Sequence, residues 1–242
     1  MAIESSWDSI RAGLRVLVPE QLRRAWFDVR EFAREGMDWA ALTRRIPPLS
    51  TFRASAAGSA AELRPLYQEY VTDVSAPYMA ISLDLAVLLT VLCEALRPQS
   101  ILDLGSGFSS VVFRRHAMSR GPGITVWSVD DSEEWLGRTG RFLSRHGLAA
   151  DNLVGYDLLL RDNNAQFDLV LHDLGTMDVR ARTLAEAIAR TRSGGVIVLD
   201  DVHKQPYASL AKRALAREGM TPYSLRRVTE DDISRYSLLA FR

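Results

Sequence analysis

A glycine-rich turn follows an apolar segment in the stretch Ser100-Ile-Leu-Asp-Leu-Gly-Ser-Gly-Phe-Ser-Ser110. The apolar residues before Gly105 predict a buried parallel strand, and the residues from Ser109 onward predict the start of a helix. Gly105 and Gly107 allow the backbone to come close to a ligand, and an exposed helix N-terminus favours an anionic group. This order of strand, tight turn and helix is typical of a site for a nucleotide-like cofactor.

A second strand-like run, Ile124–Asp130, ends in a carboxylate 25 residues after Gly105. One carboxylate at a strand tip can accept hydrogen bonds from both hydroxyls of a ribose, so we expect Asp130 to bind a ribose. Alternatively, Asp130, Asp131 and Ser132 only cap the helix that begins near Glu133. The two interpretations are compatible, and we expect Asp131 and Ser132 to cap.

Carboxylates follow two more predicted strands, with Asp173 after 167–172 and the pair Asp200-Asp201 after 195–199. Neighbouring strand ends lie ~5 Å apart, so these three side chains could converge. Like charges so close repel unless a cation, a proton or donors intervene, and oxygen ligands favour a hard ion such as magnesium or calcium. Alternatively, Asp200 and Asp201 cap the helix near Pro206 while Asp173 contacts substrate directly.

The glycine turn departs from a dinucleotide site, because Gly-x-Gly-x-x-Gly requires glycine where this chain has Ser110. With Asp103 two positions before Gly105, it reads Asp-x-Gly-x-Gly and resembles the first motif of class I S-adenosylmethionine-dependent methyltransferases. Together with the three strand-end acids, the pattern is most similar to the small-molecule O-methyltransferases of the catechol and caffeoyl-CoA type. The resemblance covers about residues 65–242. It implies methyl transfer from S-adenosylmethionine to an oxygen of a small organic acceptor, with possible assistance from a metal such as magnesium.

The resemblance also implies roles for individual residues. Asp173, Asp200 and Asp201 would bind the divalent ion, which would lower the pKa of a substrate hydroxyl. Met79 would lie over the cofactor, although it could equally be core filler. Asp157 would hold the adenine amine, although an aspartate that only forms a turn is the alternative. The expected cofactor-binding residues are Met79, Ser82, Asp103, Gly105, Ser106, Gly107, Ser109, Asp130, Asp131, Asp157 and Asp173.

The catalytic base is not assigned by the resemblance, because catechol-type enzymes carry a lysine three residues after the aspartate and this chain has Thr176 there. A histidine titrates near neutrality, and a desolvated lysine can also take a proton. We therefore expect His203 or Lys204 to act beside Asp173 in catalysis, with His172 as a third candidate. Each of these residues could instead be purely structural.

Alternating strand-like and helical segments from residue 81 onward predict a Rossmann-like, doubly wound α/β fold with a mostly parallel sheet. The strands are expected near 100–104, 124–129, 153–156, 167–172 and 195–199. The helices are expected near 82–96, 108–119, 132–146, 178–192 and 206–218. Two further strand candidates lie at 223–228 and 236–241, and the resemblance implies that they close a seven-stranded sheet as an antiparallel hairpin.

Residues 1–75 show helical periodicity without a convincing strand, which predicts a helical N-terminal cap before a methyltransferase domain at 76–242. The periodic positions are Ile10, Leu14, Leu17, Leu22, Trp26, Val29 and Phe32. Pro47-Pro48 and the small residues at 54–59 predict a flexible joint, and Ser59-x-x-Glu62 predicts a capping box that starts the next helix. Trp26 and Trp39 could shape a substrate pocket or only pack the cap.

The composition limits the classes of partner. The chain has 242 residues, with 30 basic and 30 acidic side chains, so it has no general field that attracts nucleic acid or anionic membrane. The N-terminus does not resemble a signal peptide and no apolar run approaches the ~20 residues of a membrane span, so we expect a cytoplasmic protein. The single cysteine, Cys93, is expected to be a buried free thiol. We expect a small-molecule acceptor, and a homodimer is allowed by the sequence.

Two other functions agree with parts of the sequence. The first is a non-catalytic protein that binds S-adenosylmethionine as a partner or sensor, supported only by the missing lysine at Thr176. The second is a nicotinamide-dependent oxidoreductase, which would share the first turn and Asp130 but not the altered glycine pattern, the Asp200-Asp201 pair or the closing hairpin.

Overall fold

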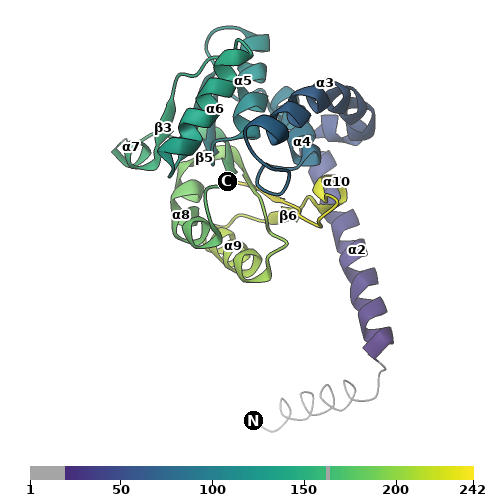
Figure 1. The fold of residues 1–242 in the computed structure, drawn as a ribbon. Helices are drawn as coiled ribbons and strands as arrows, with labels where there is room; N and C mark the ends of the chain where they lie inside the picture. Colours follow the sequence, from purple (N-terminus) through teal and green to yellow (C-terminus); the bar gives the residue numbers. More distant parts are fainter. Residues whose placement is uncertain (1–19, 162–163) are drawn as a thin grey trace.

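The computed structural model describes the backbone of residues 20–161 and 164–242, and the side chains from Phe32 onward within those ranges. In this part of the chain, seven strands form one sheet in the order β3-β2-β1-β4-β5-β7-β6 (Figure 1). β1 to β5 are parallel, and β7 is antiparallel to both β5 and β6. The strands are β1 (Ser100–Leu104), β2 (Thr125–Asp130), β3 (Leu153–Gly155), β4 (Phe167–His172), β5 (Thr191–Leu199), β6 (Pro222–Ser224) and β7 (Leu238–Phe241). The predicted Rossmann-like fold with its closing antiparallel pair is confirmed.

Helices cover both faces of the sheet, because alternate strand residues point to opposite sides. Ile101, Leu169 and Val196 pack with α4 (Leu83–Leu96), α5 (Phe108–Arg120) and α6 (Glu133–Arg145). The neighbouring Leu102, Val170 and Ile197 pack with α7 (Tyr156–Arg161), α8 (Met177–Arg190) and α9 (Gln205–Arg217). The central strands are therefore apolar at nearly every position, as expected of a parallel sheet buried on both faces.

Several elements differ from the sequence prediction. α8 ends at Arg190, so β5 begins at Thr191, where Thr191 pairs with Phe167 of β4. The strand predicted at 223–228 stops at Ser224, and α10 (Arg226–Thr229) follows. Leu225 leaves the extended conformation there and is fully buried in the cluster that contains α4, so tertiary packing overrides the local strand pattern.

The N-terminal region is helical, as predicted, and the helices break at Pro47-Pro48, as predicted, but not at 54–59. α2 (Glu20–Arg45) ends just before Pro47, the 3₁₀ helix η1 (Pro47–Thr51) follows, and α3 (Phe52–Asp73) begins at once. The small residues at 54–59 lie inside α3, so the predicted joint there and the capping box at Ser59 are wrong. This stretch is rich in alanine, which favours helix, and helix formation begins earlier because Phe52 is buried against Trp39.

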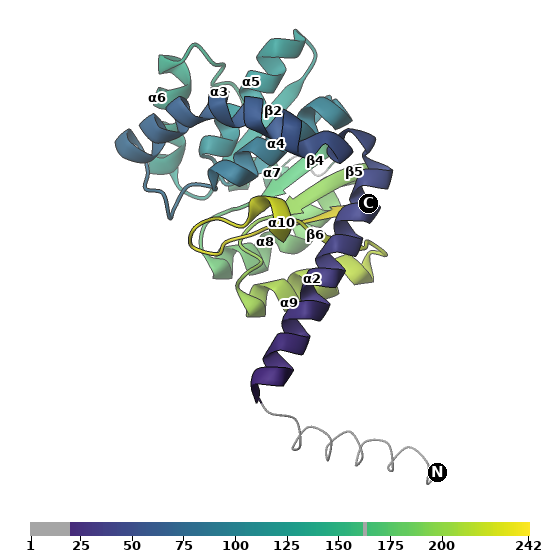
Figure 2. The same cartoon turned by 90° about the vertical axis from the view of Figure 1, so that its right-hand side faces the viewer.

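α2 extends away from the body of the molecule toward its N-terminal end (Figures 1 and 2). Its C-terminal part is anchored, because Asp38 Oδ2 accepts from the backbone N–H of Ser224 at 2.9 Å and the Arg45 guanidinium lies 3.8 Å from the centre of the Phe241 ring. Trp39 packs edge-to-face on Phe52, which supports the packing interpretation of this tryptophan. The side chains of Ile10 to Val29 in the predicted cap, Trp26 included, lie outside the described residues.

α3 shares a core with the rest of the fold. Leu63 and Tyr70 of α3 belong to the same hydrophobic cluster as α4 and the sheet. The boundary at residue 75 between a cap and a methyltransferase domain stays a prediction. Cys93 of α4 is a fully buried free thiol, as expected, and burial raises its pKa. Over the ranges 20–161 and 164–242, no helix combines the length and apolar character needed to cross a bilayer.

Asp168 of β4 connects this strand to the start of β1 through hydrogen bonds, and its removal should destabilise the protein. Its Oδ2 accepts from the backbone N–H groups of Gln99 at 2.5 Å and Ser100 at 3.0 Å, and its Oδ1 pairs with Arg192. Asp168→Ala leaves two backbone donors without their acceptor and should lower the free energy of unfolding by about 2–3 kcal/mol in denaturant titration. The exposed Asp232→Ala serves as the control, and equal unfolding midpoints for the two variants would contradict this role.

Candidate active site

A cavity of about 400 Å³ lies at the carboxyl ends of β1, β2, β4 and β5. Its volume is in the range of small-molecule sites, and the edge is the one at which open α/β sheets bind ligands. Eleven of the fifteen predicted site residues line it: Met79, Gly105, Ser106, Gly107, Ser109, Asp130, Asp131, Asp173, Asp200, Asp201 and Lys204. A larger cavity of about 770 Å³ between α2 and α9 contains none of them.

Four predicted site residues do not line this cavity: Ser82, Asp103, Asp157 and His203. Ser82 is buried and caps α4, because its hydroxyl accepts from the backbone N–H of Leu85 at 3.0 Å. Asp157 is exposed on α7. Asp103 and His203 each contact residues that do line the cavity, and are described below.

The glycine turn brings the ends of β1 and β4 together. Gly105 has φ +111°, a conformation that side-chain-bearing residues rarely adopt, and a Cβ there would lie 2.5 Å from the carbonyl oxygen of Asp173. The backbone N–H of Asp173 in turn donates to the carbonyl of Leu104 at 2.6 Å. Only glycine at position 105 permits this close approach, which places the first motif against the acidic end of β4.

Asp103 stabilises the glycine turn through a hydrogen bond with Ser110. It is fully buried, and its Oδ2 accepts from the hydroxyls of Ser110 at 2.6 Å and Ser128 at 2.9 Å. Ser110 also accepts from the backbone N–H of Gly107 at 3.2 Å, and Ser128 accepts from Arg114 at 2.6 Å. Burial raises the pKa of Asp103, while its hydroxyl partners oppose the shift. Ser110, where a dinucleotide site would have glycine, is thus the residue that links the turn to Asp103.

Asp130 faces the turn from the end of β2. Its Oδ2 accepts from the backbone N–H of Ser106 at 2.8 Å and from the Ser106 hydroxyl at 3.0 Å, while Oδ1 accepts from the backbone N–H of Ser132 at 3.0 Å. Burial raises its pKa to about 6. Ser132 caps α6 by accepting from the backbone N–H of Trp135, as predicted, whereas Asp131 lines the cavity beside Gly175. Asp130 is therefore held rigidly beside the glycine turn.

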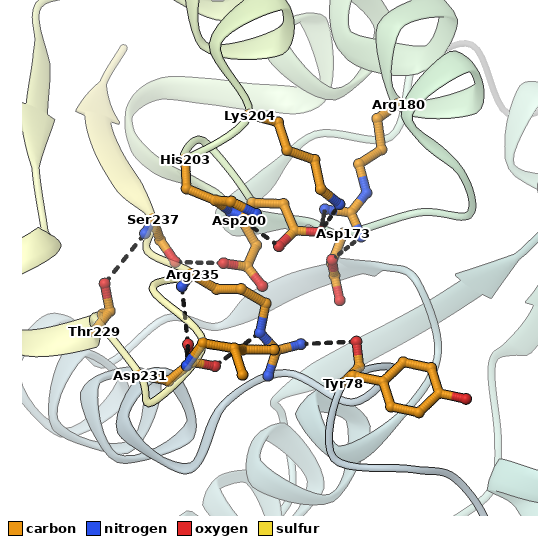
Figure 3. Close-up of polar contacts among 12 residues, drawn as sticks. Tyr78, Asp173, Arg180, Asp200, His203, Lys204, Thr229, Asp231, Arg235 and Ser237 are labelled. Atoms are coloured by element: carbon orange, nitrogen blue, oxygen red, sulfur yellow. Dashed lines mark hydrogen bonds and ion pairs between the residues drawn. The ribbon is translucent and has the colours of Figure 1, made fainter.

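The strand-end acids Asp173 and Asp200 lie close together beside Arg180 of α8 (Figure 3), and Asp201 also pairs with this arginine. The guanidinium pairs through Nη2 with Asp173 and through Nη1 with Asp201 Oδ2 at 3.0 Å. Asp201 has φ +58°, so the chain turns sharply after β5. The adjacent carboxylates of Asp200 and Asp201 therefore contact different partners. Asp200 instead accepts from the Ser237 hydroxyl at 2.7 Å.

This arrangement does not fit the three-carboxylate metal site expected from the sequence. The Arg180 guanidinium pairs with two of the three acids, and the hydroxyl of Ser237, just before β7, donates to the third. Within the described ranges, no cluster of three or more histidine, cysteine, aspartate or glutamate side chains is arranged to hold a metal ion. Sequence reasoning missed Arg180, although one signal was available: it lies in the first turn of a helix, where the helix dipole disfavours a cation.

The pKa shifts of the three acids follow from burial, from the neighbouring acids and from the cations that oppose these two effects. Burial raises the pKa of Asp173, with Arg180 opposing the shift. Burial and the neighbouring Asp201 raise the pKa of Asp200. Burial alone would raise the pKa of Asp201, but Arg180 and Lys204 together hold it below its usual value. Asp201 is therefore the acid of this group that most readily carries a charge.

The three base candidates have different environments. His172 is fully buried, with Nδ1 2.8 Å from the Tyr207 hydroxyl and Nε2 2.9 Å from the Thr183 hydroxyl, and burial lowers its pKa to about 3. His172 as a base is therefore wrong, because both ring nitrogens are engaged. His203 Nδ1 lies 3.5 Å from Asp201 Oδ1, and Lys204 Nζ lies 3.2 Å from Asp201 Oδ2. Thr176, at the position of the missing lysine, caps α8.

Two chain segments cover the cavity and are joined by Arg235. Its guanidinium donates to the carbonyls of Pro77, Tyr78 and Ala80 at 2.9–3.1 Å, and its Nε donates to Asp231 at 2.7 Å. Figure 3 shows Arg235 between Tyr78 and Asp231. Arg235 was also missed, since nothing in the sequence relates position 235 to a turn more than 150 residues earlier. Met79 in this segment is 55% exposed, so its alternative role as core filler is wrong.

Comparisons with known proteins show the fold. No protein-family model and no curated protein matches this sequence. The O-methyltransferase TomG of tomaymycin synthesis from Streptomyces achromogenes, solved with SAM, is 20% identical, with a TM-score of 0.55 over 73% of this chain and 88% of that chain. An O-methyltransferase from Bacillus cereus, solved with SAH, is 17% identical, with a TM-score of 0.56 over 74% and 89%. Cofactor-bound Rv0187 from MTB is 22% identical, with a TM-score of 0.55 over 81% and 89%. The chain has the Rossmann-like methyltransferase fold.

The raised pKa of Asp130 predicts a pH-dependent stability. A carboxyl whose pKa is raised by folding stabilises the folded state while protonated, and this contribution is lost as the pH rises through the folded pKa. With a shift from 3.8 to about 6, the stability of Asp130→Asn relative to the unmutated protein should rise by on the order of 2 kcal/mol from about pH 4 to pH 7. Denaturant titrations across that range measure the difference, and a difference independent of pH would contradict the environment described for Asp130.

Proposed function

We propose that this protein is an S-adenosylmethionine-dependent methyltransferase that acts on an oxygen of a small organic acceptor. The observation that carries the proposal is the 400 Å³ cavity in which the Asp-x-Gly-x-Gly turn, Asp130 and Asp173 meet at the carboxyl edge of the sheet. A methyltransferase fold alone does not fix a substrate, so the proposal depends on these side chains. The cofactors in the structures of TomG and the Bacillus cereus enzyme support it.

The residues around the cavity fit this cofactor. Asp130 would accept from the ribose hydroxyls, and the N-terminus of α5 at Gly107 and Phe108 would face the methionyl carboxylate. The lining has five aspartates and three cationic side chains, an excess that suits a ligand with a sulfonium and an ammonium. Met79, Ser82, Asp131 and Asp157 remain proposed contacts, and Asp103 acts through the turn. When bound, the cofactor supplies an already activated methyl group.

His203 and Lys204 are the proposed bases. Transfer requires the acceptor O–H to give its proton to a base while the oxygen forms its bond to the methyl carbon and the bond from carbon to sulfur breaks. Asp201 contacts both candidates, at 3.5 Å from His203 Nδ1 and 3.2 Å from Lys204 Nζ, and would orient whichever residue takes the proton. Of the two, Lys204 lines the cavity, whereas His203, with a side chain that is 24% exposed, does not.

We extend the proposal to partners and location. The acceptor is a small molecule, the protein acts in the cytoplasm without nucleic acid or membrane, and it can form a homodimer. The balanced charge of 30 basic and 30 acidic residues supports the absence of nucleic acid. The antiparallel β7 between β5 and β6 and the serine at position 110 disfavour a nicotinamide-dependent oxidoreductase, because a dinucleotide site needs a third glycine there.

Calorimetric titration with S-adenosylhomocysteine tests the cofactor. We expect micromolar binding, no binding of NADH, and an affinity at least about tenfold lower for Asp130→Ala, because hydrogen bonds to a charged acceptor are lost. Affinity should also fall as the pH drops through about 6, where Asp130 becomes protonated. The exposed Asp151→Ala is the control. Binding of NADH instead, or unchanged affinity in Asp130→Ala, would refute the cofactor assignment.

Substitution of the two base candidates tests the chemistry once an acceptor has been found by screening. His203→Ala or Lys204→Ala should lower kcat by about 10²–10⁴-fold and leave S-adenosylhomocysteine affinity unchanged, because general base catalysis contributes that much to the rate. Lys212→Ala, the chain's other lysine, is the matched control and should keep full turnover. Full turnover at saturating acceptor in both variants would exclude these residues as the base. Binding of the cofactor product without methyl transfer to any acceptor would favour the sensor.

A further inference from the structure

A buried arginine occupies the position at which a divalent cation was expected. Arg180 contacts Asp173 and Asp201, which follow two adjacent parallel strands, and its side chain is only 8% exposed. The two carboxylates are themselves 13% and 11% exposed. One guanidinium thus compensates two largely buried acids on different strands.

The position of Arg180 is set by α8. Thr176 caps the helix, and the backbone N–H of Arg180 donates to the carbonyl of Thr176 at 2.9 Å, so the residue lies one turn inside the helix. From there the guanidinium extends to the ends of β4 and β5 (Figure 3). Arg180 also lines the same cavity as the glycine turn and Asp130.

A metal ion and this guanidinium exclude each other. An ion bound by Asp173 and Asp201 would have to displace Arg180 from both carboxylates. Arginine cannot lose its charge to relieve the conflict, and an unpaired buried guanidinium costs several kcal/mol. The third acid does not favour the ion either, because Asp200 is hydrogen-bonded to Ser237.

We propose that Arg180 serves as the resident cation of the acceptor side of this site, so that methyl transfer here is independent of divalent metal. The part of this inference that concerns methyl transfer rests on the proposed function. The exclusion of a metal ion from the acidic cluster is independent of it. Arg180 holds Asp173 and Asp201 in place and supplies the positive charge beside the acceptor oxygen.

Titration of the full chain with manganese chloride after chelator treatment tests the exclusion directly. The unmutated protein should bind no manganese at submillimolar concentration, whereas Arg180→Ala, which frees two carboxylates, should bind it at least about tenfold more tightly. Arg182→Ala, an exposed arginine two residues along the same helix, should behave as the unmutated protein. Micromolar manganese binding by the unmutated protein that is lost in Asp201→Asn would overturn the proposal, as would an Arg180→Ala variant that binds manganese no better.

Two additional measurements separate this inference from the proposed function. Arg180→Lys keeps one positive charge at this position and keeps the test valid if Arg180→Ala does not fold. The manganese affinity of Arg180→Lys should stay near that of the unmutated protein. S-adenosylhomocysteine titration of the same samples reports the cofactor site alone, so its failure in the unmutated protein counts against the proposed function and leaves the manganese result standing. With an acceptor in hand, turnover should be unchanged in excess chelator, and loss that magnesium restores would overturn metal independence.

Discussion

The burial of carboxylates at one edge of the sheet is the constraint on which this structure depends. Asp103, Asp130, Asp173, Asp200 and Asp201 all lie at or near the carboxyl ends of the parallel strands and are largely removed from water. A buried charge is tolerated only when donors or counter-charges surround it. The protein meets this requirement in two ways. Hydroxyl and backbone donors surround Asp103 and Asp130, while Arg180 and Lys204 face the cluster around Asp201.

These two solutions divide the site by chemistry. On the side of the glycine turn, the groups that donate to Asp130 are the uncharged backbone N–H and hydroxyl of Ser106. The carboxylate of Asp130 therefore keeps its charge for recognition of hydroxyl groups. On the side of β4 and β5, the guanidinium of Arg180, which extends from α8, pairs with Asp173 and Asp201. The close approach at Gly105 joins the two sides through the backbone of Asp173. A cofactor on one side and an acceptor on the other would therefore meet beside Asp173.

The cavity is lined by segments far apart in the sequence, including Tyr78–Ile81 and Arg235. Arg235 connects Pro77–Ala80 to the loop containing Asp231 through four hydrogen bonds. Tyr78 and Met79 in this segment are 69% and 55% exposed, although both line the cavity. Large apolar side chains so exposed at the edge of a binding cavity are well placed to bury surface against a bound ligand.

The sequence by itself determined the strand order along the chain, the glycine turn, Asp130 beside it and the three strand-end acids, because these features are local or follow from parallel strands ending at one edge. It misplaced the start of α3 and the end of the strand at Ser224, where the packing of Phe52 and Leu225 overrides local pattern. Only the tertiary structure decided which groups face the acids, since Arg180 reaches Asp173 and Asp201 from α8 and Ser237 reaches Asp200 from the segment just before β7, and no motif relates either residue to the site. The spacing of acids along a chain predicts that they converge, whereas the identity of their counter-charge depends on which side chain the fold buries among them.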